Sequence, residues 1–171
     1  MLILNMVNIE QVHHTKFLGV IMNDRLNWND HIKMVCTKVN KNTGILYRTR
    51  KNLNTNTLLL LYQTLIQAYL EYCNIIWSVD DSDFLQILLI KQKKAVRAIN
   101  FGKWNCHTAQ ICASLQILSL YNINNCQSCS FVYKSLNNLL PSQFSNFFYS
   151  NKDLHDHNTR HKKYSSNILS H

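Results

Sequence analysis

Two kinds of hydrophobic pattern divide the chain. Short apolar runs between polar breaks fill residues 2–21, where Leu2–Leu4, Ile9–Val12 and Phe17–Met22 are typical of β-strands. Apolar positions recur every three to four residues from Asn29 to Leu139, which is the period of amphipathic helices. Gly19, inside the last apolar run, indicates a bulge or a close backbone approach. The pattern predicts a short N-terminal β-hairpin followed by helices.

Five helices are expected after the hairpin. Asn29 or Asp30 can cap the first, Thr55 or Asn56 can cap the second, and Gly102 can end the third. The second is apolar on most sides, which is typical of a central helix. We expect helices over about 30–51, 57–77, 83–100, 107–115 and 120–139.

The apolar faces of these helices predict the core. The first helix should bury Ile32, Val35, Cys36, Val39 and Leu46, and the third Leu85, Leu88, Leu89, Gln92, Val96 and Ile99. The fold class is therefore mainly α: a short β-hairpin, a bundle of about five helices and a polar, poorly ordered C-terminal tail. The corresponding segments are residues 1–28, 29–104, 105–149 and 150–171.

The charge of the chain favours an anionic partner. Lys and Arg number 18 against 9 Asp and Glu, which gives a formal net charge of +9. Three glycines and one proline are too few for a β-sandwich or a Rossmann fold, so composition agrees with helices. The basic positions on the first and third helices are candidates for phosphate contacts. They are Lys33, Lys41, Arg48, Lys51, Lys93, Lys94 and Arg97.

Membrane and secretory signals are missing from the sequence. No apolar run approaches the roughly 20 residues of a membrane span, and no charged segment followed by an apolar one suggests a signal peptide. We therefore expect an intracellular protein without a membrane partner. In that setting the six cysteines are expected to be free, buried thiols rather than disulfides.

Catalytic and metal-binding patterns are weak. Cys126 and Cys129 have zinc-like spacing, with His155, His157 and His161 as the other possible ligands, but they lie in a helical pattern that favours buried thiols. The carboxylates at positions 80, 81 and 83 are better explained as a helix cap, and the histidine at position 31 as a packing or hydrogen-bonding residue. No phosphate loop or nucleophile elbow is present. The residues indicate a basic helical binding module.

Several short motifs follow one another in an order that carries a family likeness. Together they resemble the C-terminal part of a non-LTR (LINE-type) retrotransposon reverse transcriptase, over about residues 8–160. The motifs are Lys16-Phe-Leu-Gly-Val20, Leu26-Asn-Trp28, Asp30-His-Ile32, Val39-Asn-Lys41, Gly44-Ile-Leu-Tyr47, Leu61-Tyr62, Tyr72-Cys-Asn74, Trp77, Gln92-Lys-Lys-Ala95, Arg97-Ala-Ile99, Ile117-Leu118, Phe131-Val-Tyr-Lys134, Leu140-Pro141 and His157-Asn-Thr-Arg160.

The resemblance implies a role for each part. The segment Lys16, Phe17, Leu18 and Gly19 would be the primer grip, and the following helices would be a thumb and a connection region on an RNA–DNA duplex. The family's aromatic-x-Asp-Asp motif is absent, since Asp80-Asp81 follows Val79. The resemblance therefore implies a truncated, catalytically inactive fragment without a cofactor of its own. Mg²⁺ would belong to the missing palm, and the missing fingers and palm would be partners.

Two other functions remain open. A host could have co-opted the same basic helices as a nucleic-acid-binding protein of its own. Alternatively, the chain could be a protein–protein scaffold in which the basic charge is incidental.

Overall fold

A computed structural model describes residues 2–4, 7–9, 12–78, 83–101, 106–144, 147–150 and 168–170. Within them the chain is mainly helical and has short antiparallel strand pairs near its N-terminus, as the sequence predicts. The chain divides into two compact units, Met1–Asn124 and Asn125–His171. Most of the C-terminal tail, which the sequence predicts to be poorly ordered, lies outside the described residues.

The N-terminal strands form two antiparallel pairs, and the turn of the second pair corrects the sequence-based prediction. The strands are β1 (Leu2–Leu4) with β2 (Val7–Ile9), and β3 (His14–Phe17) with β4 (Val20–Asn23). The apolar run predicts one strand over Phe17–Met22, but Phe17 pairs with Val20 across a two-residue turn. Leu18 and Gly19 have φ values of 46° and 87°. Hairpins favour such turns because two positive φ values match the twist of the strands.

The helices of the first unit lie close to the predicted ranges. They are α1 (Asn29–Thr49), α2 (Thr55–Tyr62), the π-helical turn η1 (Gln63–Gln67), α3 (Ala68–Glu71), α4 (Asn74–Trp77), α5 (Asp83–Ile99), α6 (Thr108–Ser114) and the start of α7 (Leu120–Leu136). The N-caps predicted for α1 and α2 are wrong, while Gly102, expected to end α5, lies outside the described residues. The cap position of α1 is Trp28, without a side-chain hydrogen bond. The Asn54 side chain caps α2 by accepting a 2.9 Å hydrogen bond from the Thr57 N–H.

The helix predicted over residues 57–77 is interrupted. After α3, Tyr72 is extended and Cys73 is left-handed, with a φ of 51°, so α4 starts in a new direction. Side chains satisfy the backbone groups that this break releases: Trp77 Nε1 donates to the Tyr72 carbonyl at 2.9 Å, and Asn74 donates to the Leu70 carbonyl at 2.8 Å. Apolar periodicity continues through the break, which is why the sequence pattern does not reveal it.

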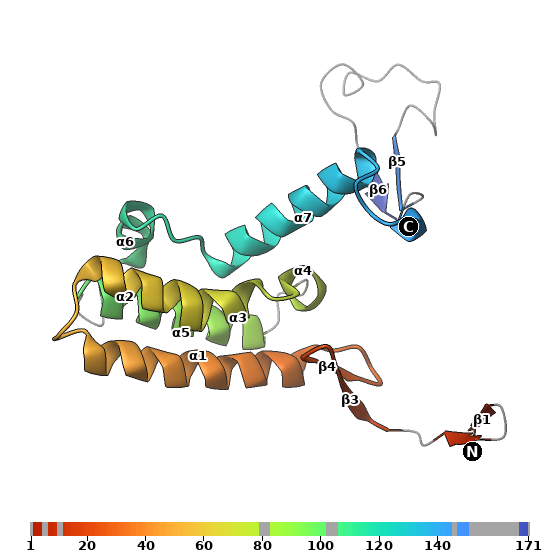
Figure 1. Ribbon diagram of the computed structural model, residues 1–171, viewed down its shortest axis with the longest axis horizontal. Coiled ribbons are helices and arrows are strands. Elements are labelled where there is room, and N and C mark those ends of the chain that lie inside the picture. The colour runs from red at the N-terminus through yellow and green to blue at the C-terminus, as the bar shows by residue number, and fades with distance from the viewer. Residues whose placement is uncertain are drawn as a thin grey trace. The chain divides into compact units, whose positions relative to one another are not determined.

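Three helical rods form the centre of the first unit: α1, the α2–α3 segment and α5 (Figure 1). Short connections make α1 and α2 antiparallel, whereas α1 and α5 run in the same direction. Lys33 lies over the Phe84 ring at their N-terminal ends, and Arg50 lies near the Phe101 ring at their C-terminal ends. The predicted face of α1 is buried, and five of the six positions predicted for α5 are buried as well, Leu89 being half-buried.

The second unit contains the C-terminal part of α7, the short helix η2 (Ser142–Phe144), and the antiparallel pair β5 (Phe148–Ser150) and β6 (Ile168–Ser170). Phe131 packs edge-on against Phe144 and Phe148, with ring centres 5.7 and 6.0 Å apart. The Ser135 hydroxyl donates to the Phe144 carbonyl at 3.2 Å. These contacts fold the segment after Pro141 back onto α7.

Candidate nucleic-acid interface

The helices α1 and α5 carry almost all of their charge as cations. The sequence has no Asp or Glu between residues 31 and 70, nor between residues 84 and 152. The first stretch nevertheless includes six Lys or Arg residues, and α5 includes four. In the part of the first unit that the structure describes, the acidic residues are Asp24, Asp30, Glu71 and Asp83. Both helices therefore present surfaces with a positive electrostatic potential.

The parallel arrangement of α1 and α5 separates the charges along the bundle. Asp30 and Asp83 lie in the first turns of these helices, while Arg48 and Arg97 lie in the last turns. Since the two helices start at the same end, the acidic residues gather there and cations gather at the other end. Acidic residues at a helix N-terminus and basic residues at its C-terminus interact favourably with the helix macrodipole. Each such charge stabilises the fold by about 0.3–1 kcal/mol.

The structure gives the predicted basic residues different surroundings. Lys33 is partly engaged, because its Nζ lies 3.5 Å from the Asp30 carboxylate and 4.9 Å from the centre of the Phe84 ring. Arg97 is half-buried and its Nε donates to the Cys106 carbonyl at 3.0 Å. The others are exposed at the surfaces of the two helices; they are Lys41, Arg48, Lys51, Lys93 and Lys94.

Sequence reasoning missed Arg50. Its guanidinium carbon lies 4.9 Å from the centre of the Tyr47 ring and 6.0 Å from that of Phe101, which joins the C-terminal ends of α1 and α5. The contact between Tyr47 and Arg50 could be predicted from the sequence, because residues three apart are neighbours on a helix. Phe101 is distant in sequence, so its part in the contact depends on the tertiary fold.

The turn proposed as a primer grip is anchored to the bundle. The Tyr72 hydroxyl donates a 2.5 Å hydrogen bond to the Leu18 carbonyl. A Cβ placed on Gly19 would lie 3.6 Å from Tyr72 Cε1, so the aromatic ring packs directly against the glycine. Phe17 and Leu18 remain 62% and 73% exposed. A fixed backbone therefore presents two apolar side chains to solvent, next to the exposed Lys16.

His31 joins the same hairpin to the start of α1. Its Nδ1 accepts a 3.3 Å hydrogen bond from the Ile21 N–H, so this nitrogen is unprotonated. The ring packs against Trp77, with the ring centres 5.5 Å apart. Burial lowers the pKa of His31 from its ordinary value of 6.5, because the charged imidazolium would lose its hydration. The prediction of a packing and hydrogen-bonding histidine agrees with this geometry.

The turn and the cationic end of the bundle are far apart. The turn docks near the N-terminal end of α1, while Arg48 and Lys51 lie at or beyond its C-terminal end. A helix of 21 residues is about 31 Å long. The structure therefore does not bring Lys16–Gly19 together with those cations, and one nucleic-acid strand would have to run along α1 to reach both.

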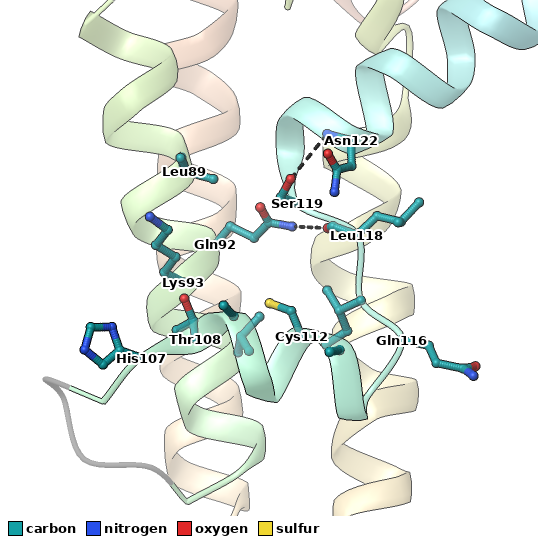
Figure 2. Close-up of a pocket in the computed structure, with 14 residues that line it drawn as sticks. Leu89, Gln92, Lys93, His107, Thr108, Cys112, Gln116, Leu118, Ser119 and Asn122 are labelled. Atoms are coloured by element: carbon teal, nitrogen blue, oxygen red, sulfur yellow. Dashed lines mark hydrogen bonds between the residues drawn. The ribbon is translucent and has the colours of Figure 1, made fainter.

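A cavity of about 690 Å³ lies between α5, α6 and the start of α7. Gln92 points across it and donates a 2.8 Å hydrogen bond to the Leu118 carbonyl (Figure 2). Lys93 and Cys112 also line the cavity, whereas the neighbouring Lys94 does not. Burial raises the pKa of Cys112, which disfavours a reactive thiolate. Lys93 and Lys94 therefore lie on different sides of α5, and only Lys93 faces the cavity.

The cysteines, clustered carboxylates and tail histidines were the weaker candidates for metal binding or catalysis. All six cysteines are free, as expected, but only Cys36 is buried: Cys73, Cys106 and Cys112 are half-buried, and Cys126 and Cys129 are exposed on α7. Asp80, Asp81, His155, His157 and His161 lie outside the described residues. Among the residues that the structure does describe, no three His, Cys, Asp or Glu side chains are grouped to hold a metal.

The described helices were compared with the requirements of a membrane span, and the whole chain with known proteins. None of the described helices combines the length and apolar character needed to cross a bilayer. Comparison of the chain with protein-family models, with curated proteins and with solved structures found no match.

Proposed function

We propose that this chain binds the backbone of nucleic acid through the basic surfaces of α1 and α5, in the manner of the thumb of a non-LTR reverse transcriptase. The observation that carries the proposal is the pairing of two parallel helices whose exposed charges, beyond their first turns, are all cationic. Such surfaces bind phosphates without reading the base sequence. The order of the sequence motifs supports the same assignment.

The proposal gives the β3–β4 turn a second contact with the nucleic acid. The Tyr72 hydrogen bond and the Gly19 contact hold the turn in place, and Phe17 and Leu18 are free to touch a sugar or a base. No polymerase activity is expected from these residues, since the chain has no aromatic-x-Asp-Asp sequence to bind Mg²⁺. A primer-extension assay with Mg²⁺ tests that expectation, and template-dependent extension would contradict it.

Measurement of RNA–DNA duplex affinity against salt tests the binding itself. Counterion release predicts a steep linear fall of log K with log salt between about 50 and 200 mM. Replacement of Lys41, Arg48 and Lys94 by Gln should reduce the slope by about one for each phosphate that the variant no longer neutralises. Arg97 is left unchanged because it bonds the Cys106 carbonyl. Lys134→Gln, on α7, is the control and should leave the slope unchanged.

A protein–protein scaffold is the competing function. The exposed Ile87 and Ile90 on α5 are 44% and 63% accessible, and a protein partner could bury them. A salt-independent affinity, or a triple variant that binds as tightly as the wild type, would refute phosphate binding and favour the scaffold.

A further inference from the structure

An aromatic and cationic cluster closes one end of the bundle. Arg50 lies over the Tyr47 ring and near the Phe101 ring, and Tyr47 and Arg50 are themselves half-buried. Phe101 is 53% exposed, so a large part of its surface is open to solvent. The cluster therefore consists of two supported groups and one aromatic side chain that is accessible from outside.

Phe101 also adopts a backbone conformation that aromatic residues rarely take. It follows the last residue of α5 by two positions and has a φ of 52°. A residue in a left-handed conformation just after a helix is usually glycine, because a Cβ is strained there. The chain does have a glycine, but one residue later, at position 102. A strained, exposed aromatic residue points to a function outside the packing of the fold.

Cations surround this aromatic residue in the sequence and in the fold. Arg48 and Lys51 are exposed on either side of Arg50 at the end of α1. Lys94 lies seven residues before Phe101, about two helical turns away along α5. The C-terminal ends of α1 and α5, which carry partial negative charge, also lie here. An anion would therefore bind only where the attraction of these cationic side chains exceeds the repulsion from the helix ends.

We infer that the Tyr47–Arg50–Phe101 cluster is a stacking site for an unpaired base of single-stranded RNA or DNA, with the neighbouring cations on its phosphates. This inference rests on the proposed nucleic-acid binding and adds a substrate class to it. A duplex hides the faces of its bases, whereas a single strand exposes them to aromatic rings. The site accepts any base, because every base has a flat π-face.

The test measures binding of three labelled probes to the full chain by fluorescence anisotropy. The probes are a thymidine dodecamer, an abasic dodecamer with the same phosphates, and a blunt duplex of the same length. Phe101→Leu should weaken thymidine-dodecamer binding about tenfold, since it keeps an apolar side chain but removes the ring. It should leave abasic and duplex binding within about twofold. A uridine dodecamer should respond as the thymidine dodecamer does.

Two further variants separate stacking from an effect on folding. Phe101→Gly removes the backbone strain, so its melting temperature should equal or exceed that of the wild type while single-strand binding falls. Phe101→Trp should keep single-strand binding, because an aromatic ring is retained. Tyr133→Leu is the matched control, since Tyr133 is an exposed aromatic residue of α7 and should not contribute.

The outcomes distinguish this inference from the proposed function. If the wild type binds the probes with a steep salt dependence but Phe101→Leu binds the thymidine dodecamer equally well, the stacking site is refuted and phosphate binding stands. An equal weakening on the thymidine and abasic probes would also refute stacking. If the wild type binds none of the probes at low salt, both the proposed function and the stacking site fail.

Discussion

The Tyr72 hydroxyl donates a hydrogen bond to the carbonyl of Leu18, 54 residues earlier in the chain. This bond connects the turn of the β3–β4 hairpin to the end of α3, where the helix breaks at Cys73. Because the helix ends at this break, the Tyr72 side chain is placed where its hydroxyl reaches the hairpin. A two-stranded hairpin is marginal alone, and this contact supplies some of the support it needs.

Tyr72→Phe should destabilise the protein by about 1 kcal/mol, since it removes one hydrogen bond and keeps the ring packed on Gly19. Hydrogen exchange of the amides in β3 and β4 should accelerate more than exchange in α5. Urea unfolding and exchange mass spectrometry measure the two effects. Tyr69→Phe, on α3, is the control. Equal exchange rates in β3 and β4 of wild type and variant would show that Tyr72 does not hold the turn.

We expect His31 to make the docking of the hairpin sensitive to pH. Its pKa is lower in the folded protein than the ordinary 6.5, so the unfolded chain binds more protons between those two values. The contribution of His31 to the free energy of unfolding is therefore fully present above about pH 6.5, and it is lost as the pH falls through the pKa of His31 in the folded protein. Protonation of Nδ1 would also break the hydrogen bond from the Ile21 N–H.

Comparison with His31→Asn isolates this effect, because the other histidines are unchanged. Urea midpoints measured from about pH 5 to 8 should fall more steeply toward acid for the wild type than for the variant. Parallel pH profiles of wild type and variant would mean that His31 titrates alike in the folded and unfolded states.

The sequence predicts the helices well, because amphipathic periodicity follows directly from the burial of one face. Ile32, Val35 and Val39 show this on α1, where all three are buried. It predicts local interruptions poorly: the turn at Leu18–Gly19 and the left-handed Cys73 both lie within apolar runs. Contacts such as Arg50 with Phe101 depend on how distant elements pack, and no local pattern encodes them.

Gln92 is a buried polar residue whose replacement should be costly. Its Nε2 donates to the Tyr62 hydroxyl at 3.0 Å and to the Leu118 carbonyl, and its Oε1 accepts from the Leu120 N–H at 2.9 Å. Gln92→Leu should destabilise the fold by about 3 kcal/mol, because it removes these partners from buried groups. Tyr62→Phe removes one bond and should cost about 1 kcal/mol. Denaturant midpoints in the opposite order would contradict this role of Gln92.

Gly44 lies in the interior of α1, on the turn between the exposed cations Lys41 and Arg48. A Cβ at this position would meet no atom within 4 Å, so Gly44→Ala should raise stability by about 0.5–1 kcal/mol through helix propensity alone. The fold gains nothing from glycine here, whereas a phosphate backbone crossing between the two cations would gain a close approach. Gly44→Leu should therefore retain stability in urea unfolding but weaken duplex binding severalfold. Equal duplex affinity of Gly44→Leu and wild type would place the bound backbone elsewhere on α1.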